Sequence, residues 1–208
     1  DKLTSDNPIH QRLLRAYSLA IPYIKGDQLE LGCGEGRGVE LLSPQVDSYL
    51  ALDKIDEVIQ KLKPRFPNVD FKQGVFPPFV GLDDNSFDTI VSFQVIEHVK
   101  DDGDFLKEIF RVLKPGGTAV LTTPNIKKTL SRNPWHEREY TAQQLIDLAL
   151  KHFDQVDMKG VAGNEKVMAY YDENKKSVEK ITRFDIFNLQ YRLPNALLRI
   201  PYDILNRI

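Results

Sequence analysis

The chain has 208 residues, of which 41% are hydrophobic, so it is long enough for one domain with a full core and short for two. Its 28 basic and 30 acidic residues give a formal net charge of −2, which provides no strong signal for nucleic-acid binding. The single cysteine, Cys33, cannot form an internal disulfide, and no apolar run predicts a signal peptide or a transmembrane segment. We therefore expect a cytoplasmic protein, with Asp1 marking a processed or trimmed N-terminus.

Short β-rich runs alternate with helical runs along most of the chain. The first helix is expected over residues 8–24, where apolar residues recur at helical spacing. Short apolar runs predict strands at 28–31, 49–53, 69–71, 88–93 and 118–123, with a sixth at 156–161. Further helices are expected at 39–42, 55–62, 105–113 and 141–153, with residues 114–117 ending the third of these and Thr141 capping the fourth.

This alternation predicts an α/β fold with a doubly wound, mostly parallel sheet and helices on both faces. Residues 1–163 are expected to form the core, and residues 164–208 a helical cover or lid of the same domain. Residues 167–171 are the only β-like stretch in that cover, and they are the alternative for closing the edge of the sheet. The apolar residues of the cover need a partner surface, which is either the mouth of the active site or a second copy in a homodimer.

A glycine-rich loop follows the first strand and precedes a helix. It reads Glu30-Leu31-Gly32-Cys33-Gly34-Glu35-Gly36, so its glycines are spaced G-x-G-x-G and not G-x-G-x-x-G as in dinucleotide-binding loops. Glu30 would repel a pyrophosphate, but it suits a cofactor that carries a sulfonium and an ammonium group. Asp53 ends the second strand, where acids of nucleoside-binding α/β folds accept hydrogen bonds from ribose hydroxyls. The loop therefore favours S-adenosylmethionine over a dinucleotide.

At this point the sequence resembles the class I S-adenosylmethionine-dependent methyltransferases, of the kind with a type 11 or type 23 methyltransferase domain. Besides the loop and Leu52-Asp53, the resemblance rests on four segments between residues 25 and 160, namely Phe87-Asp88-Thr89-Ile90, Ile96-Glu97-His98-Val99, Leu113-Lys114-Pro115-Gly116-Gly117 and Thr122-Thr123-Pro124-Asn125. It implies a Rossmann-like fold, S-adenosylmethionine as cofactor and methyl transfer. The cofactor-binding residues that it implies are Glu30, Gly32, Cys33, Gly34, Gly36, Asp53, Lys54, Gly74, Val75, Phe76 and Gln94.

The sequence departs from this family after the third strand. Many members carry Gly-Asp-Ala there, with the Asp bound to the adenine amine, whereas this chain has Gln73-Gly74-Val75-Phe76. Without that carboxylate, we expect backbone amides and Val75 or Phe76 to hold the adenine.

Two histidines are candidates for removing a proton from a hydroxyl acceptor, because the pKa of histidine lies near neutrality. His98 follows the fourth strand and His136 follows the fifth, so both lie at the same edge of the sheet. The structural alternatives are a capping or packing role for His98 and a turn role for His136.

A second resemblance concerns metal binding. Small-RNA 2′-O-methyltransferases and some ubiquinone-pathway O-methyltransferases carry Glu-x-x-Glu-His after the fourth strand, and these groups bind a divalent metal. Here the first glutamate is replaced by Gln94 in Gln94-Val95-Ile96-Glu97-His98, and a neutral amide oxygen is a weaker ligand for Mg²⁺. We therefore expect no metal.

The leading interpretation is transfer of a methyl group to an oxygen of a small molecule, a sugar or a lipid-like acceptor, with transfer to nitrogen left open. The alternatives are a nucleotide-dependent oxidoreductase, which the glycine spacing opposes, and a non-catalytic S-adenosylmethionine-binding regulatory or partner subunit. The sequence alone does not identify the acceptor.

Overall fold

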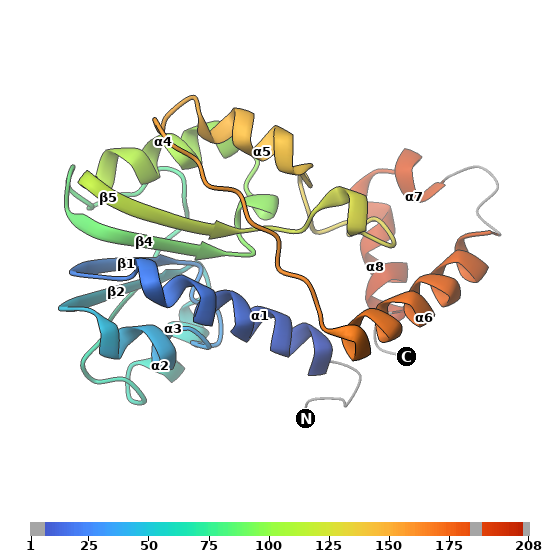
Figure 1. The fold of residues 1–208 in the computed structure, drawn as a ribbon, viewed down its shortest axis with the longest axis horizontal. Helices are drawn as coiled ribbons and strands as arrows, with labels where there is room; N and C mark the ends of the chain where they lie inside the picture. The colour runs from blue at the N-terminus through green and yellow to red at the C-terminus, as the bar shows by residue number, and fades with distance from the viewer. Residues whose placement is uncertain (1–6, 184–188, 206–208) are drawn as a thin grey trace.

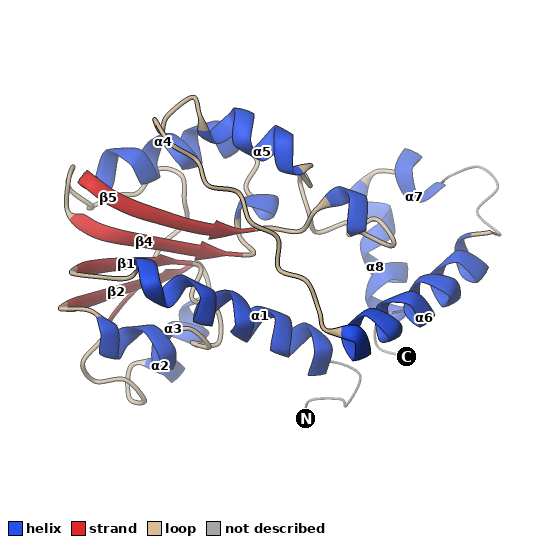
Figure 2. Cartoon of the chain, viewed as in Figure 1, coloured by secondary structure: helices blue, strands red, loops and turns tan. Residues whose placement is uncertain are grey.

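The computed structural model describes residues 7–183 and 189–205 (Figure 1). Its centre is one parallel sheet of five strands in the order β3-β2-β1-β4-β5 (Figure 2). The strands are β1 (Asp27–Leu31), β2 (Ser48–Asp53), β3 (Asp70–Gln73), β4 (Phe87–Phe93) and β5 (Leu113–Thr122). The predicted doubly wound parallel sheet is therefore confirmed.

Helices cover both faces of the sheet, as the strand-helix alternation requires. On one face lie α1 (Asn7–Ala20), α2 (Val39–Leu42) and α3 (Asp56–Leu62), and on the other lie α4 (Asp102–Val112) and α5 (Ala142–Ala149) (Figure 1). Short 3₁₀ helices occur at Ile21–Tyr23, Ser43–Gln45, Ile96–His98 and Ile126–Lys128.

Each face has its own hydrophobic core, because successive side chains of a strand point to opposite faces. Leu29 and Leu31 of β1 pack with Phe105 and Ile109 of α4. On the other face, Tyr17, Ala51, Val39, Ile59 and Leu62 belong to a second core. Glu30 lies between the two leucines of β1, so its side chain points to this second face.

Three further helices follow the sheet, namely α6 (Glu165–Thr182), α7 (Leu189–Arg192) and α8 (Asn195–Leu205). Figure 1 shows them beyond the carboxyl ends of the strands, where α1 also extends. The helical cover expected after residue 163 is therefore present, although residues 184–188 and 206–208 of it lie outside the described residues. The β-like stretch 167–171 is part of α6, so the alternative of an edge strand there is wrong.

Two other local predictions are wrong. Residues 156–161 form no strand; Asp157, Lys159 and Gly160 disfavour sheet pairing, and Lys159 instead binds Asp157 and the hydroxyl of Tyr23. The fifth strand begins at Leu113 and not at Thr118, and a register shift between Phe87 and Thr89 accommodates the extra residues, although α4 does end before residues 114–117 as expected. The predicted cap is confirmed: Thr141 and Gln144 form a reciprocal capping box at the start of α5, which ends at Ala149.

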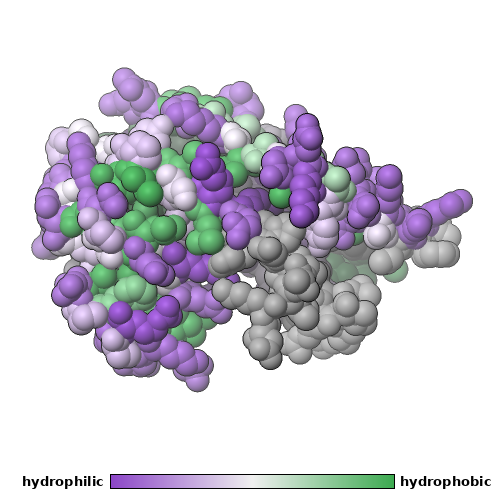
Figure 3. Space-filling model, turned by 60° about the horizontal axis from the view of Figure 1, so that its bottom comes forward, coloured by the Kyte–Doolittle hydropathy of each residue, from purple (hydrophilic) through white to green (hydrophobic). Residues whose placement is uncertain are grey.

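The surface of the α/β part is mostly hydrophilic on the face shown in Figure 3, with hydrophobic residues in separate patches. Large apolar side chains are also exposed on the cover, including Met168, Leu189 and Leu197. The homodimer expected through this segment remains a prediction. Within the described part of the chain, no helix is long and apolar enough to cross a bilayer.

Candidate functional site

The strand order reverses between β1 and β4, and the turns that follow these neighbouring strands open a cavity of about 740 Å³. Nine residues that the sequence singled out for the cofactor line this cavity, together with His98. These nine are Gly32, Cys33, Gly34, Asp53, Lys54, Gly74, Val75, Phe76 and Gln94. Turns after four different strands, β1 to β4, thus meet in one space.

Asp53 holds the glycine loop in its open shape. One carboxylate oxygen accepts a hydrogen bond from the backbone N–H of Gly34 at 2.8 Å, and the other accepts one from the N–H of Ile55 at 3.0 Å. Gly34 has a φ of +49°, which an L-residue adopts only with strain, and a Cβ at this position would meet no protein atom within 4 Å. The loop therefore presents backbone, and not side chain, to the space beside Asp53.

Glu30 lies beneath the loop and does not line the cavity. Its side chain is buried, with 1% of the residue exposed, and its two oxygens accept hydrogen bonds from the hydroxyls of Tyr17 at 3.0 Å and Tyr49 at 2.8 Å. Burial raises the pKa of Glu30 to about 7, although both tyrosine hydrogen bonds oppose the shift. Glu30 therefore contacts the cavity wall only through the hydroxyl of Tyr17, which does line the cavity.

Two other predicted cofactor residues are also held by the core. The Cys33 thiol is buried, and burial raises its pKa, so it contributes packing and no thiolate chemistry. Gly36 lies in a separate cleft beside α3, where a Cβ would come within 2.6 Å of Leu62.

Gln94 directly follows β4 in a strained conformation, with a φ of +59°. Its side-chain amide donates to the hydroxyl of Thr122 at 3.2 Å, and its backbone N–H donates to the Thr122 carbonyl at 2.8 Å. Strained residues concentrate at functional sites, where the surrounding structure holds them in place. Gln94 is thus fixed at the middle of the cavity wall.

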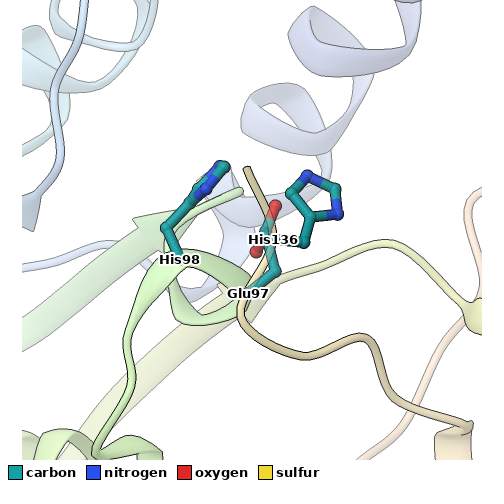
Figure 4. A group of neighbouring side chains, drawn as sticks. All are labelled: Glu97, His98 and His136. Carbon is teal, nitrogen blue, oxygen red and sulfur yellow. The ribbon is translucent and has the colours of Figure 1, made fainter. Parts of the chain in front are cut away.

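His98 and His136 come together at one end of the cavity, with their ring centroids 4.8 Å apart (Figure 4). Nδ1 of His98 lies 2.9 Å from the carbonyl oxygen of Trp135, and a carbonyl only accepts, so Nδ1 carries the proton. Nε2 of His98 is therefore the nitrogen with a free lone pair. Because His98 is exposed and lines the cavity, this lone pair is available to a ligand.

Both ring nitrogens of His136 are already in use. Nδ1 lies 2.6 Å from a carboxylate oxygen of Glu139, and Nε2 lies 2.9 Å from the side-chain amide nitrogen of Asn133. The N–H of Trp135 donates to the side-chain oxygen of Asn133, which fixes the orientation of that amide. Burial opposes ionisation of Glu139, but hydrogen bonds from His136 and Thr129 lower its pKa overall. His136 does not line the cavity, but its ring packs edge to face against that of His98.

Glu97 completes the cluster. Figure 4 shows its carboxylate between the two imidazoles, and the donor atoms of Glu97, His98 and His136 lie within 4.8 Å of one another. Burial raises the pKa of Glu97, while the hydroxyl of Thr123 donates to its carboxylate at 2.9 Å. Two imidazoles and a carboxylate are a donor set that can hold a transition metal such as Zn²⁺.

The sequence did not predict the contact between two residues of the cavity wall, Arg199 and Trp135. Arg199 of α8 lies over the ring of Trp135, with its guanidinium carbon 4.3 Å from the ring centroid. Both side chains line the cavity. No local pattern joins them, because α8 reaches Trp135 only through the tertiary fold.

Comparison with known proteins gives the site a family context. Residues 29–121 match the family model described as "Methyltransferase domain". A probable S-adenosylmethionine-dependent methyltransferase of Mycolicibacterium smegmatis is 40% identical over 128 residues, which cover 59% of this chain and 49% of that protein. The mitochondrial ubiquinone biosynthesis O-methyltransferase of Homo sapiens is 33% identical over 104 residues, which cover 47% of this chain and 28% of that protein. The chain therefore spans about half the length of the Mycolicibacterium relative and a smaller share of the human one.

Among solved structures, a protein from Pyrococcus horikoshii OT3 superposes with a TM-score of 0.64 at 21% identity. The match covers 75% of this chain and 86% of that chain. This likeness supports the Rossmann-like fold.

Glycines 34 and 36 should respond differently to the same added methyl group. We expect Gly34→Ala to weaken S-adenosylhomocysteine binding at least tenfold, because its Cβ enters the cavity, and to lower the free energy of unfolding by about 1–2 kcal/mol through backbone strain alone. Gly36→Ala should add overpacking against Leu62 to the same backbone strain and lower the free energy of unfolding by about 2–5 kcal/mol. Calorimetric titration and urea unfolding measure the two effects.

Gly103→Ala is the matched control, because Gly103 lies in the first turn of α4 with open space around its Cβ position. It should leave both quantities unchanged. Wild-type affinity in Gly34→Ala would show that the loop does not face the cofactor.

Glu30 should make stability depend on pH in the direction opposite to most carboxylates. Its pKa is about 7 in the folded state and 4.5 ordinarily, so the folded state binds the proton more tightly. The contribution of Glu30 to the free energy of unfolding is then largest below pH 4.5 and falls as pH rises to about 7. Because Gln cannot ionise, the free energy of unfolding of Glu30→Gln should rise relative to that of wild type, by on the order of 3 kcal/mol, as pH increases across this window.

Urea unfolding at several pH values from 5 to 8 measures this difference. Glu40→Gln, which changes an exposed glutamate of α2, is the control and should run parallel to wild type. A constant difference between Glu30→Gln and wild type would mean that Glu30 is ionised throughout.

Proposed function

The chain belongs to the class I S-adenosylmethionine-dependent methyltransferase superfamily, and we propose that it transfers a methyl group from this cofactor to an oxygen of a small-molecule, sugar or lipid-like acceptor. The observation that carries the proposal is one continuous cavity. Its wall combines the backbone of the glycine loop, the Asp53 carboxylate and the unoccupied Nε2 of His98. The O-methyltransferase among its relatives agrees with an oxygen acceptor.

The cofactor would lie along the glycine loop. Asp53 has further lone pairs beyond those used by Gly34 and Ile55, and these would accept from the ribose hydroxyls. Gly74, Val75 and Phe76 line the adenine end, where Phe76 is braced by stacking on Phe105 at 5.8 Å between ring centroids. The methionine part would run past Gly34 toward Gln94. This arrangement directs the methyl group toward His98.

The chemistry is an in-line displacement at the methyl carbon. When bound, S-adenosylmethionine would supply the methyl carbon that the acceptor oxygen attacks and, as the carbon–sulfur bond broke, a neutral thioether as the leaving group. The hydroxyl proton passes to Nε2 of His98, whose Nδ1–H remains on the Trp135 carbonyl. Because the leaving sulfur starts with a positive charge, the protein mainly supplies alignment and a base.

His136 and Glu139 would act by positioning. Their 2.6 Å hydrogen bond fixes the ring against which His98 packs edge to face. Since Asn133 occupies the remaining nitrogen of His136 and Thr123 bonds to Glu97, we propose that the cluster works without a metal. A non-catalytic cofactor-binding subunit is less well supported, because it would not need a free imidazole beside the methyl position.

The cofactor assignment predicts that Asp53→Asn weakens S-adenosylhomocysteine binding by about 1–3 kcal/mol, through lost charge-assisted hydrogen bonds. Isothermal titration calorimetry measures this change. Asp56→Asn is the control, because Asp56 is an exposed acid of α3 whose side chain accepts a hydrogen bond from Gln60. Equal affinities of wild type and Asp53→Asn would remove Asp53 from the cofactor site.

The base assignment predicts that His98→Ala lowers methyl transfer by a factor on the order of 10²–10⁴, with little change in S-adenosylhomocysteine affinity. The assay follows labelled methyl groups from S-adenosylmethionine into a metabolite extract, with products identified by mass. His136→Ala should cost less activity and more stability, because it leaves Glu139 partly buried and without its histidine.

Metal dependence provides the decisive control for this assignment. Wild-type activity should survive dialysis against a chelator. Loss of activity that Mg²⁺, Mn²⁺ or Zn²⁺ restores would contradict the base mechanism, and it would assign Glu97, His98 and His136 to a metal. Full activity in His98→Ala would leave positioning alone as the mechanism.

A further inference from the structure

We propose that Arg199, held against Trp135, binds an anionic group of the methyl acceptor, so that the acceptor carries a carboxylate or a phosphate. The inference rests on the proposed function, because it assigns a substrate class to the same cavity. It concerns the end of the cavity opposite the adenine-binding residues.

Arg199 is in the right place to contact an acceptor. It belongs to α8, which lies beyond the carboxyl ends of the strands (Figure 1), and its side chain lines the cavity with Gln94, His98 and Trp135. An acceptor whose hydroxyl reaches His98 would therefore extend toward Arg199.

The guanidinium has unused hydrogen-bonding capacity. The guanidinium lies over the Trp135 ring, and its terminal N–H groups make no hydrogen bond to the residues that the structure describes, so they can bind two oxygens at once. Its Nε atom is buried and has no hydrogen-bond partner in the part of the chain that the structure describes. Among the ion pairs of the described residues, none includes Arg199, although six other Lys and Arg side chains form them. Buried donors without partners are uncommon in native proteins, and an oxyanion would satisfy this one.

The arginine is held in place before any ligand binds. Arg132 donates to the carbonyl of Leu193 at 3.2 Å and to the side-chain oxygen of Asn195, and these contacts fasten the start of α8 to the loop that carries Trp135. The carbonyl of Trp135 in turn accepts from His98. A continuous set of contacts therefore joins the proposed anion site to the proposed base, which fixes the distance between them.

An acid of the same cavity wall would oppose a free anion. Glu137 also lines the cavity, and it is exposed. An anion must reach Arg199 in spite of this charge, so an anionic group that is positioned by the rest of the acceptor is favoured over a free ion. Removing the charge of Glu137 should consequently strengthen anion binding.

The test uses the intrinsic fluorescence of Trp135, which is the only tryptophan of the chain. The protein, saturated with S-adenosylhomocysteine, is titrated with inorganic phosphate and with benzoate at constant ionic strength, and benzamide serves as the neutral counterpart of benzoate. We expect a saturable change for the anions and none for benzamide. Arg199→Gln should weaken the response at least tenfold, Arg199→Lys should weaken it less, and Glu137→Gln should strengthen it.

Arg192→Gln is the matched control, because it removes the same charge from an exposed position of α7 that does not line the cavity. It should bind the anions as wild type does. Thermal unfolding and S-adenosylhomocysteine affinity show whether each variant keeps its fold and cofactor site.

The outcomes separate this inference from the proposed function. Two results would overturn the anion site alone, provided that S-adenosylhomocysteine still binds normally. One is the lack of a saturable anion response, and the other is an equal response in wild type and Arg199→Gln. Absence of S-adenosylhomocysteine binding would overturn the proposed function, and a titration without cofactor would still test whether Arg199 binds anions. A weaker response in Glu137→Gln would also contradict the proposal, because it would make Glu137 part of the binding site.

Discussion

The site depends on one carboxylate, that of Asp53, which joins two turns of the sheet. Parallel strands place β1 and β2 side by side, and Asp53 at the end of β2 accepts from Gly34 in the turn that follows β1. This bond at 2.8 Å holds a left-handed glycine where its N–H faces the acid and its missing side chain leaves room for a ligand. Asp53 itself lines the same cavity. In the proposed function, one residue thus both shapes the cofactor loop and offers a contact to the cofactor.

A second set of contacts connects the acceptor end of the cavity to the C-terminal cover. The carbonyl of Trp135 contacts His98, and the ring of Trp135 contacts Arg199. Arg132 joins the start of α8 to the same loop. The cover therefore belongs to the wall of the site. In the proposed mechanism it contributes to recognition of the acceptor, while the sheet contributes the cofactor site and the base. This division agrees with the general observation that one fold can carry different functions through the residues added around it.

The sequence predicted those parts of the structure that depend on local patterns. Apolar runs and glycine spacing gave the strands, their parallel arrangement and the edge at which Asp53, Gln94 and His98 meet, because the strands of a doubly wound sheet all end at one edge. The sequence did not predict that Glu30 binds Tyr17 and Tyr49, because only the packed second core brings these side chains together. The contact of Arg199 with Trp135 depends on where α8 lies, and no short-range pattern encodes that placement. The segment 156–161 failed as a strand because its few apolar residues are separated by charged residues and a glycine, which outweigh its weak alternation.

The central claim is that the cofactor lies along the glycine loop with its sulfur directed at His98. The most direct measurement is a crystal structure of the full chain with S-adenosylhomocysteine. We expect the ribose hydroxyls within hydrogen-bond distance of Asp53, the adenine beside Val75 and Phe76, and the sulfur facing Gln94 and Nε2 of His98. Density for the ligand in the separate cleft beside α3, lined by Arg37, Lys61 and Arg65, would contradict this account. So would a sulfur that points away from His98.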